Sequence, residues 1–217
     1  MKKLLYKELK LCASPLSYLF LLGAFLVFVP GYPILMGAFF TPLGIFYSFQ
    51  AIRDNNDIEY SLLLPTAKTD IVRGKFLFVL LIEGCSFVIM TAITLIRMLC
   101  FCDARVYVSN ALMCANFTFL GFALLIFGLF NFIFVSGFFK TAYYFGKPFL
   151  IYCVVSLVVI FVAEALRHFP GLDVLNAFGL SPFLPQGIAF AAGVVAFAAL
   201  TFFGLKRSIR FFEATDL

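Results

Sequence analysis

Long apolar runs recur along this chain of 217 residues and are separated by short polar segments. A helix that crosses the hydrocarbon core of a bilayer needs about 20 mainly apolar residues, at a rise of about 1.5 Å each. Runs that meet or nearly meet this length lie at residues 14–30, 32–52, 76–96, 110–135, 148–166 and 185–205. The pattern therefore predicts an all-α polytopic membrane protein with six transmembrane helices.

The composition supports a membrane protein. Hydrophobic residues make up 64% of the chain and charged residues 12%, and the mean hydropathy is +1.07. Soluble domains have about 45–50% apolar and about 25% charged residues. Because the apolar runs occupy most of the chain, we expect residues 1–217 to form a single transmembrane domain. The first run shows no cleavage site for a signal peptide and is predicted to remain as a helix, with Ser14 as its N-cap and Pro15 in its first turn.

Positive charge is divided unevenly between alternate connections. Thirteen of the 16 lysines and arginines fall on one predicted side: Lys2, Lys3, Lys7, Lys10, Arg53, Lys68, Arg73, Lys75, Lys140, Lys147, Lys206, Arg207 and Arg210. The other side carries Arg97, Arg105 and Arg167. The positive-inside rule then places both termini in the cytoplasm and the chain in the cytoplasmic membrane. The net charge of +5 follows from this topology and gives no support for binding nucleic acid.

The connection between the second and third spans contains an amphipathic, basic segment. Pro65 is expected to end one helix, and Thr66 or Thr69 can cap a new one that closes beside Gly74. The residues expected to project outward from this short surface helix are Lys68, Asp70, Arg73 and Lys75. Such a face can contact either a groove of a partner protein or lipid headgroups.

This segment resembles the matching part of the ABC-2 family of transporter permeases. The residues that carry the resemblance are Glu59, Leu62, Leu63, Leu64, Pro65, Lys68, Ile71, Val72, Gly74 and Lys75. The resemblance implies a cytoplasmic coupling helix over about residues 59–75, docked on a separate ABC-type ATP-binding subunit. Its docking residues would be Glu59, Pro65, Lys68, Asp70, Arg73 and Lys75. The alternative is an ordinary positively charged loop.

Three further segments resemble the same family. The aromatic and basic connection at residues 139–147 implies a second contact with the ATP-binding subunit through Lys140 and Lys147. The leucines and lysines at the N-terminus resemble an interfacial helix, and the Pro/Gly-broken stretch 169–186 resembles the short re-entrant helices of an outer gate.

The chain contains no Walker A pattern, because Gly74-Lys75 is followed by Phe76 and Gly146-Lys147 by Pro148. We therefore expect ATP and magnesium to bind on the partner subunit and no cofactor to bind on this chain. Six spans make half of a transporter, so a second permease half is expected, as a homodimer or a related heterodimer.

Polar residues within the predicted spans are candidates for a pathway or dimer interface. An ionisable group in hydrocarbon is costly unless it faces protein or water, which singles out Glu83 in the third span. The alternative for Glu83 is a neutral or paired structural role. Asn116 and Asn131 share a face of the fourth span, where hydrogen bonds between spans are favoured. The single histidine, His168, has no ligand-spaced partners, so no metal site is expected.

Small residues four apart line the sixth span, including Gly187 with Ala191 and Ala189 with Gly193, and they predict a seam of close helix packing. Taken together with the resemblance, which alone implies the outward direction of transport, these features favour the permease subunit of an ATP-driven exporter of an amphipathic or hydrophobic compound, such as a peptide or lipid-like molecule. The alternatives are a scaffold or sensor subunit that does not transport and, with no catalytic constellation to support it, an intramembrane enzyme.

Overall fold

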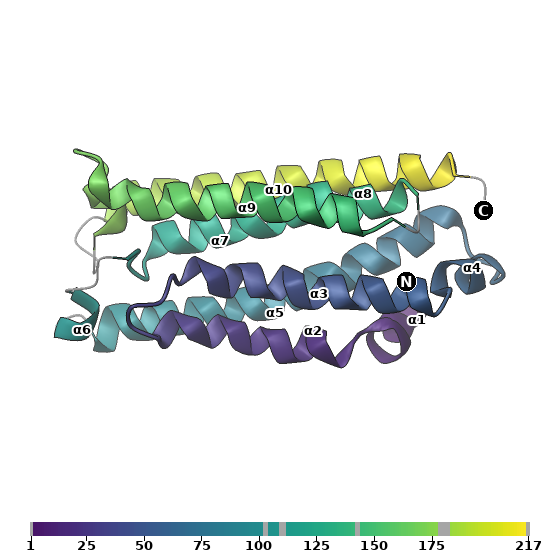
Figure 1. The fold of residues 1–217 in the computed structure, drawn as a ribbon, viewed down its shortest axis with the longest axis horizontal. Coiled ribbons are helices and arrows are strands. Elements are labelled where there is room, and N and C mark those ends of the chain that lie inside the picture. The colour runs from purple at the N-terminus through teal and green to yellow at the C-terminus, as the bar shows by residue number, and fades with distance from the viewer. Residues whose placement is uncertain (1, 102–103, 109–111, 142–143, 178–182, 216–217) are drawn as a thin grey trace.

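The computed structural model describes residues 2–101, 104–108, 112–141, 144–177 and 183–215, and these residues form helices without strands. The long helices run side by side (Figure 1). Both termini and the short helix α4 lie at one end of the bundle, here named the α4 end, and α6 lies at the other (Figure 1). In chain order the elements are α1 (Lys2–Lys7), η1 (Glu8–Cys12), α2 (Pro15–Leu19), η2 (Phe20–Phe28), α3 (Leu35–Asp54), α4 (Asp57–Leu62), α5 (Lys68–Cys100), α6 (Arg105–Val108), α7 (Phe117–Leu129), η3 (Phe130–Val135), α8 (Ser136–Phe139), α9 (Gly146–Ala165), η4 (Leu166–His168), η5 (Asp173–Asn176) and α10 (Phe183–Glu213).

Five helical stretches are long and apolar enough to cross a membrane: α3, α5, the continuous run Phe117–Phe139, α9 and α10. A sixth is obtained if the bent pair Leu4–Cys12 and Pro15–Phe28 counts as one span. The two parts of this pair meet at 93°, so the N-terminal helix lies across the bundle rather than along it. The prediction of an all-α polytopic membrane protein is confirmed.

The first span begins as the sequence predicts. The Ser14 hydroxyl accepts a hydrogen bond from the Leu16 amide at 3.3 Å, and Pro15 occupies the first turn. The segment then tightens into a 3₁₀-helix over Phe20–Phe28. A 3₁₀-helix rises about 2.0 Å per residue against about 1.5 Å for an α-helix, so this short span reaches further across a bilayer than its residue count suggests.

The third span differs from its prediction. The expected short helix between Pro65 and Gly74 is not a separate element, because α5 begins at Lys68 and continues without a break to Cys100. The separate short helix of this connection is α4, which precedes Pro65. Gly74 does not end a helix: a Cβ placed there would lie 2.4 Å from Cδ2 of Leu4, so its role is to let α1 pack closely against α5.

The predicted small-residue seam on the last span is confirmed at Gly193 and Ala189. A Cβ on Gly193 would lie 2.4 Å from the carbonyl oxygen of Gly121, and a Cβ on Gly121 would lie 2.8 Å from that of Ala189. α7 and α10 therefore approach with their backbones nearly in contact, which only residues without bulky side chains permit. Gly187, by contrast, faces open space.

Candidate functional site

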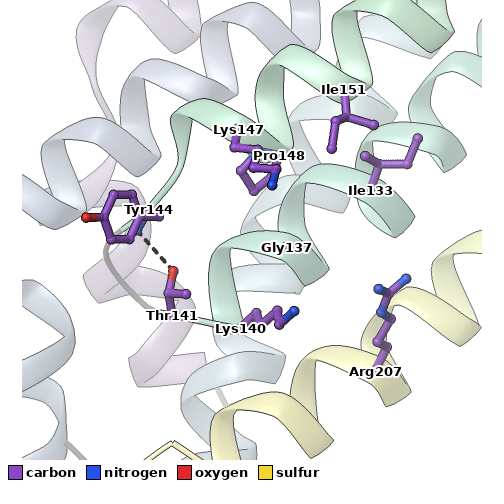
Figure 2. A pocket seen from close by; sticks show the side chains of 9 residues that line it. All are labelled: Ile133, Gly137, Lys140, Thr141, Tyr144, Lys147, Pro148, Ile151 and Arg207. Carbon is purple, nitrogen blue, oxygen red and sulfur yellow. Dashed lines mark hydrogen bonds between the residues drawn. The ribbon is translucent and has the colours of Figure 1, made fainter.

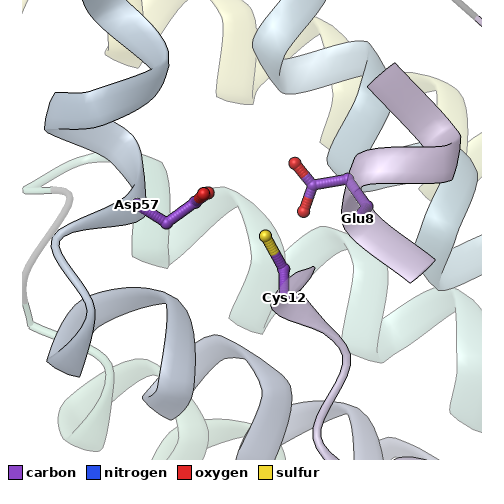
Figure 3. Close-up of side chains that lie close together, drawn as sticks. All are labelled: Glu8, Cys12 and Asp57. Atoms are coloured by element: carbon purple, nitrogen blue, oxygen red, sulfur yellow. The ribbon is translucent and has the colours of Figure 1, made fainter. Parts of the chain in front are cut away.

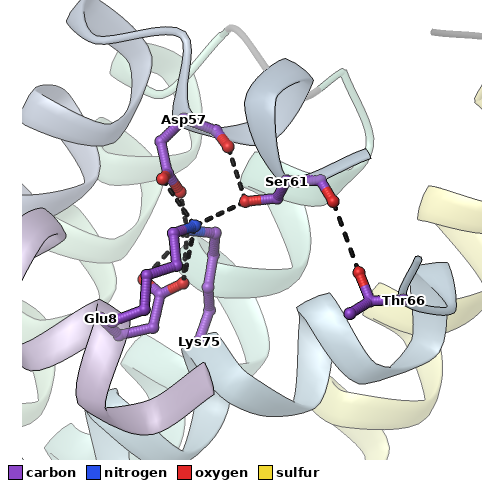
Figure 4. A network of polar contacts seen from close by, with 6 residues as sticks. Glu8, Asp57, Ser61, Thr66 and Lys75 are labelled. Atoms are coloured by element: carbon purple, nitrogen blue, oxygen red, sulfur yellow. Dashed lines mark hydrogen bonds and ion pairs between the residues drawn. The ribbon is translucent and has the colours of Figure 1, made fainter. Parts of the chain in front are cut away.

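A largely buried cluster of four charges connects four elements at the α4 end. Glu8 comes from η1, Asp57 is the first residue of α4, Lys75 lies two turns into α5, and Lys7 ends α1. Asp57 follows Asn56, whose φ of 50° places it in the left-handed region and turns the chain from α3 into α4. The cluster thus brings together residues that are far apart in the sequence (Figure 4).

The ammonium group of Lys75 occupies the centre of this four-charge cluster. Its Nζ lies 2.8 Å from Oδ2 of Asp57 and 3.0 Å from Oε2 of Glu8. Lys7 approaches from the side, with its Nζ 2.6 Å from Oδ1 of Asp57 and 2.5 Å from the hydroxyl oxygen of Ser61. That hydroxyl donates to the main-chain carbonyl of Asp57 at 2.7 Å.

The cluster is electrically balanced, and its centre is almost completely removed from solvent. Lys75 is 0% exposed and Glu8 1%, and the two cations match the two carboxylates. Burial alone would raise the pKa of Asp57, but the charges of Lys75 and Lys7, together with their hydrogen bonds, lower it below its usual value. Asp57 is therefore a carboxylate throughout the physiological range.

Three side chains of this region have the spacing of a metal site. The possible ligand atoms of Glu8, Cys12 and Asp57 lie within 4.8 Å of one another (Figure 3). The ammonium of Lys75 already donates to both carboxylates, however, and neutralises them together with Lys7. A divalent cation here would be held beside a buried ammonium, so the arrangement fits an internal ion pair better than a metal.

The outward projection expected for Lys75 is wrong, and helix geometry gives the reason. Positions two apart on an α-helix differ by about 200°, so Arg73 and Lys75 cannot share a face. Ile71 and Val72 lie within about 60° of Lys75 and are buried with it, whereas Arg73 lies on the other side of the helix and is exposed. Lys68, the first residue of α5, is only partly buried. Lys75 is thus unavailable to a partner.

The connection between α3 and α5 also exposes apolar side chains at the α4 end. The segment from Glu59 to Pro65, named here the α4 tip, exposes 61% of Tyr60 and 84% of Leu63, and Glu59 and Pro65 are exposed beside them. Large exposed apolar side chains grouped beside charged residues are typical of an interaction site.

The other residues expected to dock a partner lie at the α4 end of the bundle. Arg73 is about half-exposed and pairs with Asp70 at 3.6 Å. Lys68 donates to the main-chain carbonyl of Thr215 at 2.9 Å, which ties the start of α5 to the end of the chain. Lys140 and Lys147 are exposed at the α4 end of α8 and α9, and neither forms an ion pair with a residue that the structure describes.

Glu83 lies inside the bundle rather than on the outside of the single chain. Its Oε2 accepts a hydrogen bond from Nδ2 of Asn131 at 2.9 Å, and the same amide lies 3.1 Å from the hydroxyl of Thr201. α5, η3 and α10 are joined by this contact, which confirms the hydrogen bonding between spans expected for Asn131. Oε1 of Glu83 has no partner among the described residues, and Glu83 borders a cavity of about 290 Å³ lined mainly by leucines and phenylalanines.

Asn116 has a different role from the one predicted. Its Oδ1 caps α7 by accepting from the Phe119 amide at 2.9 Å, and its Nδ2 donates to the carbonyl of Leu175 at 3.0 Å. Gln186 donates to the carbonyl of Ala177 at 3.0 Å from the other side. The two amides together hold the segment before α10, and residues 178–182 of the predicted outer gate lie outside the described part of the chain.

Sequence reasoning missed Glu8 and Asp57 as members of a site. The cation that both carboxylates share is distant in the sequence, because Lys75 is 67 residues from Glu8 and 18 from Asp57. One available signal was that Glu8 is the single acidic residue in a basic, leucine-rich N-terminal segment.

The long apolar helices define a multi-pass membrane protein, and a buried charge cluster ties its connecting helix to a span. A family model described as an ABC-2 family transporter protein matches residues 3–213. The chain belongs to this family, which identifies it as a transporter membrane protein. Comparisons with curated proteins and with solved structures gave no match.

Proposed function

We propose that this chain is the permease subunit of an ATP-driven exporter and works with a separate ABC-type ATP-binding subunit. The observation that carries the proposal is the α4 tip, an exposed apolar surface at the end of α4, and the first residue of that helix, Asp57, is ion-paired to Lys75 of a transmembrane helix. A force applied to such a tip reaches α5 directly. In this proposal the chain lies in the cytoplasmic membrane, and its α4 end faces the cytoplasm, as the positive-inside rule favours.

The proposed docking surface consists of the α4 tip with Lys68, Asp70 and Arg73 beside it. Leu63 would be its apolar anchor, since it is the most exposed large apolar residue of the tip. An apolar centre surrounded by a polar rim is typical of protein interfaces. Lys75 contributes from within, by holding the tip against α5.

The cavity beside Glu83 supports the proposal that the substrate is amphipathic or hydrophobic. Its lining includes Leu80, Phe87, Phe127 and Phe197, and the carboxylate of Glu83 is its one ionisable group. A mostly apolar cavity with a single convergent polar group is typical of a ligand site. A second permease half, identical or related, would complete a path that one chain does not enclose.

The docking proposal is tested by co-purification with ABC-type ATP-binding subunits co-expressed from the same genome. Leu63→Glu should abolish recovery of the partner while leaving the chain folded, because Leu63 is largely exposed. Reversing Lys68 and Arg73 to glutamate should also reduce recovery. The matched control reverses Lys206 and Arg210, which are exposed cations of α10 outside the proposed surface. Recovery by the α4-tip variants equal to that of the control would contradict docking.

The pathway proposal is tested separately in the assembled complex. Glu83→Gln keeps the size of the side chain and an oxygen that can accept from Asn131. We expect it to lower the substrate-stimulated ATPase rate without dissociating the subunits. Unchanged stimulation would remove Glu83 from the pathway and leave docking unaffected.

A further inference from the structure

Three cations line one cavity at the α4 end of the bundle. Lys140 follows α8, Lys147 lies in the first turn of α9 and Arg207 lies near the end of α10, and all three border a cavity of about 520 Å³ (Figure 2). Ile133, Ile151 and Tyr144 supply apolar surface in the same cavity. A volume of about 300–1,000 Å³ is usual for a site that holds a small molecule or headgroup.

The charge of this cavity is uncompensated within the described part of the chain. None of the three cations is ion-paired to a described carboxylate, and no carboxylate lines the cavity. The guanidinium of Arg207 is positioned by two aromatic rings, 5.3 Å from the centroid of Phe132 and 5.1 Å from that of Phe211. The cavity therefore favours an anionic ligand.

The position of the cations along their helices places the cavity at headgroup depth. Lys140 follows the apolar run of α7 to α8, Lys147 precedes that of α9, and Arg207 follows that of α10. Ile133 and Ile151 lie seven and four residues further into the same runs, which corresponds to about 10 Å and about 6 Å along a helix. The cavity thus extends from a basic mouth to a depth that acyl chains occupy.

We propose that this cavity binds the phosphate headgroup of an anionic phospholipid. Lys140, Lys147 and Arg207 would neutralise the phosphate, and the upper part of the acyl chains would lie along Ile133 and Ile151. Basic pockets between transmembrane helices are well suited to such headgroups, since each cation near an anionic surface adds attraction. This proposal assigns Lys140 and Lys147 to lipid rather than to the second contact with an ATP-binding subunit.

The test measures lipid binding to the purified full-length chain in a nonionic detergent by native mass spectrometry. Phosphatidylglycerol, phosphatidylcholine and inorganic phosphate are titrated in separate arms. The wild-type chain should retain one phosphatidylglycerol in preference to phosphatidylcholine. A triple variant, Lys140→Gln, Lys147→Gln and Arg207→Gln, should bind it at least about tenfold more weakly.

A matched triple variant controls for general loss of charge. It carries Lys10→Gln, Lys206→Gln and Arg210→Gln, which remove three exposed cations outside the cavity lining. This variant should keep the wild-type preference. As a second perturbation, Ile151→Trp fills the apolar part without changing charge and should also weaken phosphatidylglycerol binding.

Several outcomes would overturn the proposal. Equal weakening in both triple variants would indicate non-specific attraction. Displacement of phosphatidylglycerol by millimolar inorganic phosphate would indicate a site for a free anion. If the cavity variant retains phosphatidylglycerol but loses a co-expressed ATP-binding subunit, the cations form a protein contact instead. Because lipid binding is read without the ATP-binding subunit, its failure leaves the proposed transport function standing.

Discussion

Replacing Lys75 by methionine tests how firmly α4 is held to α5. Methionine is apolar and similar in length, so it fits the enclosed position but removes the ammonium that donates to both carboxylates. Of the two cations of the four-charge cluster, only Lys7 then remains to neutralise Glu8 and Asp57. The change therefore leaves one buried negative charge without compensation.

The size of the expected loss of stability follows from the burial of the ion pairs of Lys75. Removing one partner of a buried ion pair costs about 3–5 kcal/mol, because the remaining charge is left desolvated. For a chain of about this size, 1 kcal/mol corresponds to a shift of about 2–4 °C in Tm, so the expected loss is about 6–20 °C. Arg73→Met is the matched control: its ion pair with Asp70 is about half-exposed, and such pairs contribute about 0–1 kcal/mol.

The assay is thermal unfolding of the purified chain in detergent, followed by circular dichroism. Lys75→Met should unfold well below both wild type and Arg73→Met. Adding Glu8→Gln to the Lys75→Met background should recover part of the loss, because the surplus negative charge disappears. Equal Tm values for the two single variants would refute the view that the cluster fixes α4 to α5.

Two further predictions concern pH and helix packing. The charges of Lys75 and Lys7 lower the folded pKa of Asp57, so this carboxylate contributes stability above its unfolded pKa of about 3.9, and the contribution is lost as pH falls through the folded value. Asp57→Asn should therefore flatten the acid-induced drop in Tm. On α10, Gly193→Ala should lower the free energy of unfolding by about 1–3 kcal/mol, because the new Cβ would meet the backbone of Gly121. Gly187 faces open space, so Gly187→Ala should stabilise the helix by up to about 1 kcal/mol. Thermal unfolding measures both changes.

The membrane-spanning architecture could be predicted because the bilayer sets strict requirements on sequence. Only helices and closed β-barrels satisfy their backbone groups in hydrocarbon, and a helix that spans the bilayer needs a long apolar run. The run 148–166 meets this requirement, and α9 is found at Gly146–Ala165. The same local logic predicted the cap at Ser14, where a side chain bonds to an amide two residues away. Local chemistry and membrane thickness are both readable from a single sequence.

The four-charge cluster could not be predicted in this way. Its contacts depend on how α1, α4 and α5 pack, and no periodicity relates Glu8 to Lys75. Gly74 was expected to end a helix because glycine often does so, yet a helix-interior glycine costs only about 1 kcal/mol, and here it accommodates Leu4. The face of Lys75, in contrast, was readable: its angular separation from Arg73 already excluded a shared outward face.

The cluster also limits which parts of the protein can move. For α4 to shift alone, Asp57 would have to leave the ammonium of Lys75 at 2.8 Å, and breaking a buried pair costs several kcal/mol. The hydrogen bond from the ammonium of Lys68 to the main-chain carbonyl of Thr215 ties the C-terminal segment to the same part of α5. The least costly response to a force on the α4 tip is therefore a joint movement of η1, α4 and the start of α5, with rearrangement at apolar helix contacts elsewhere in the bundle.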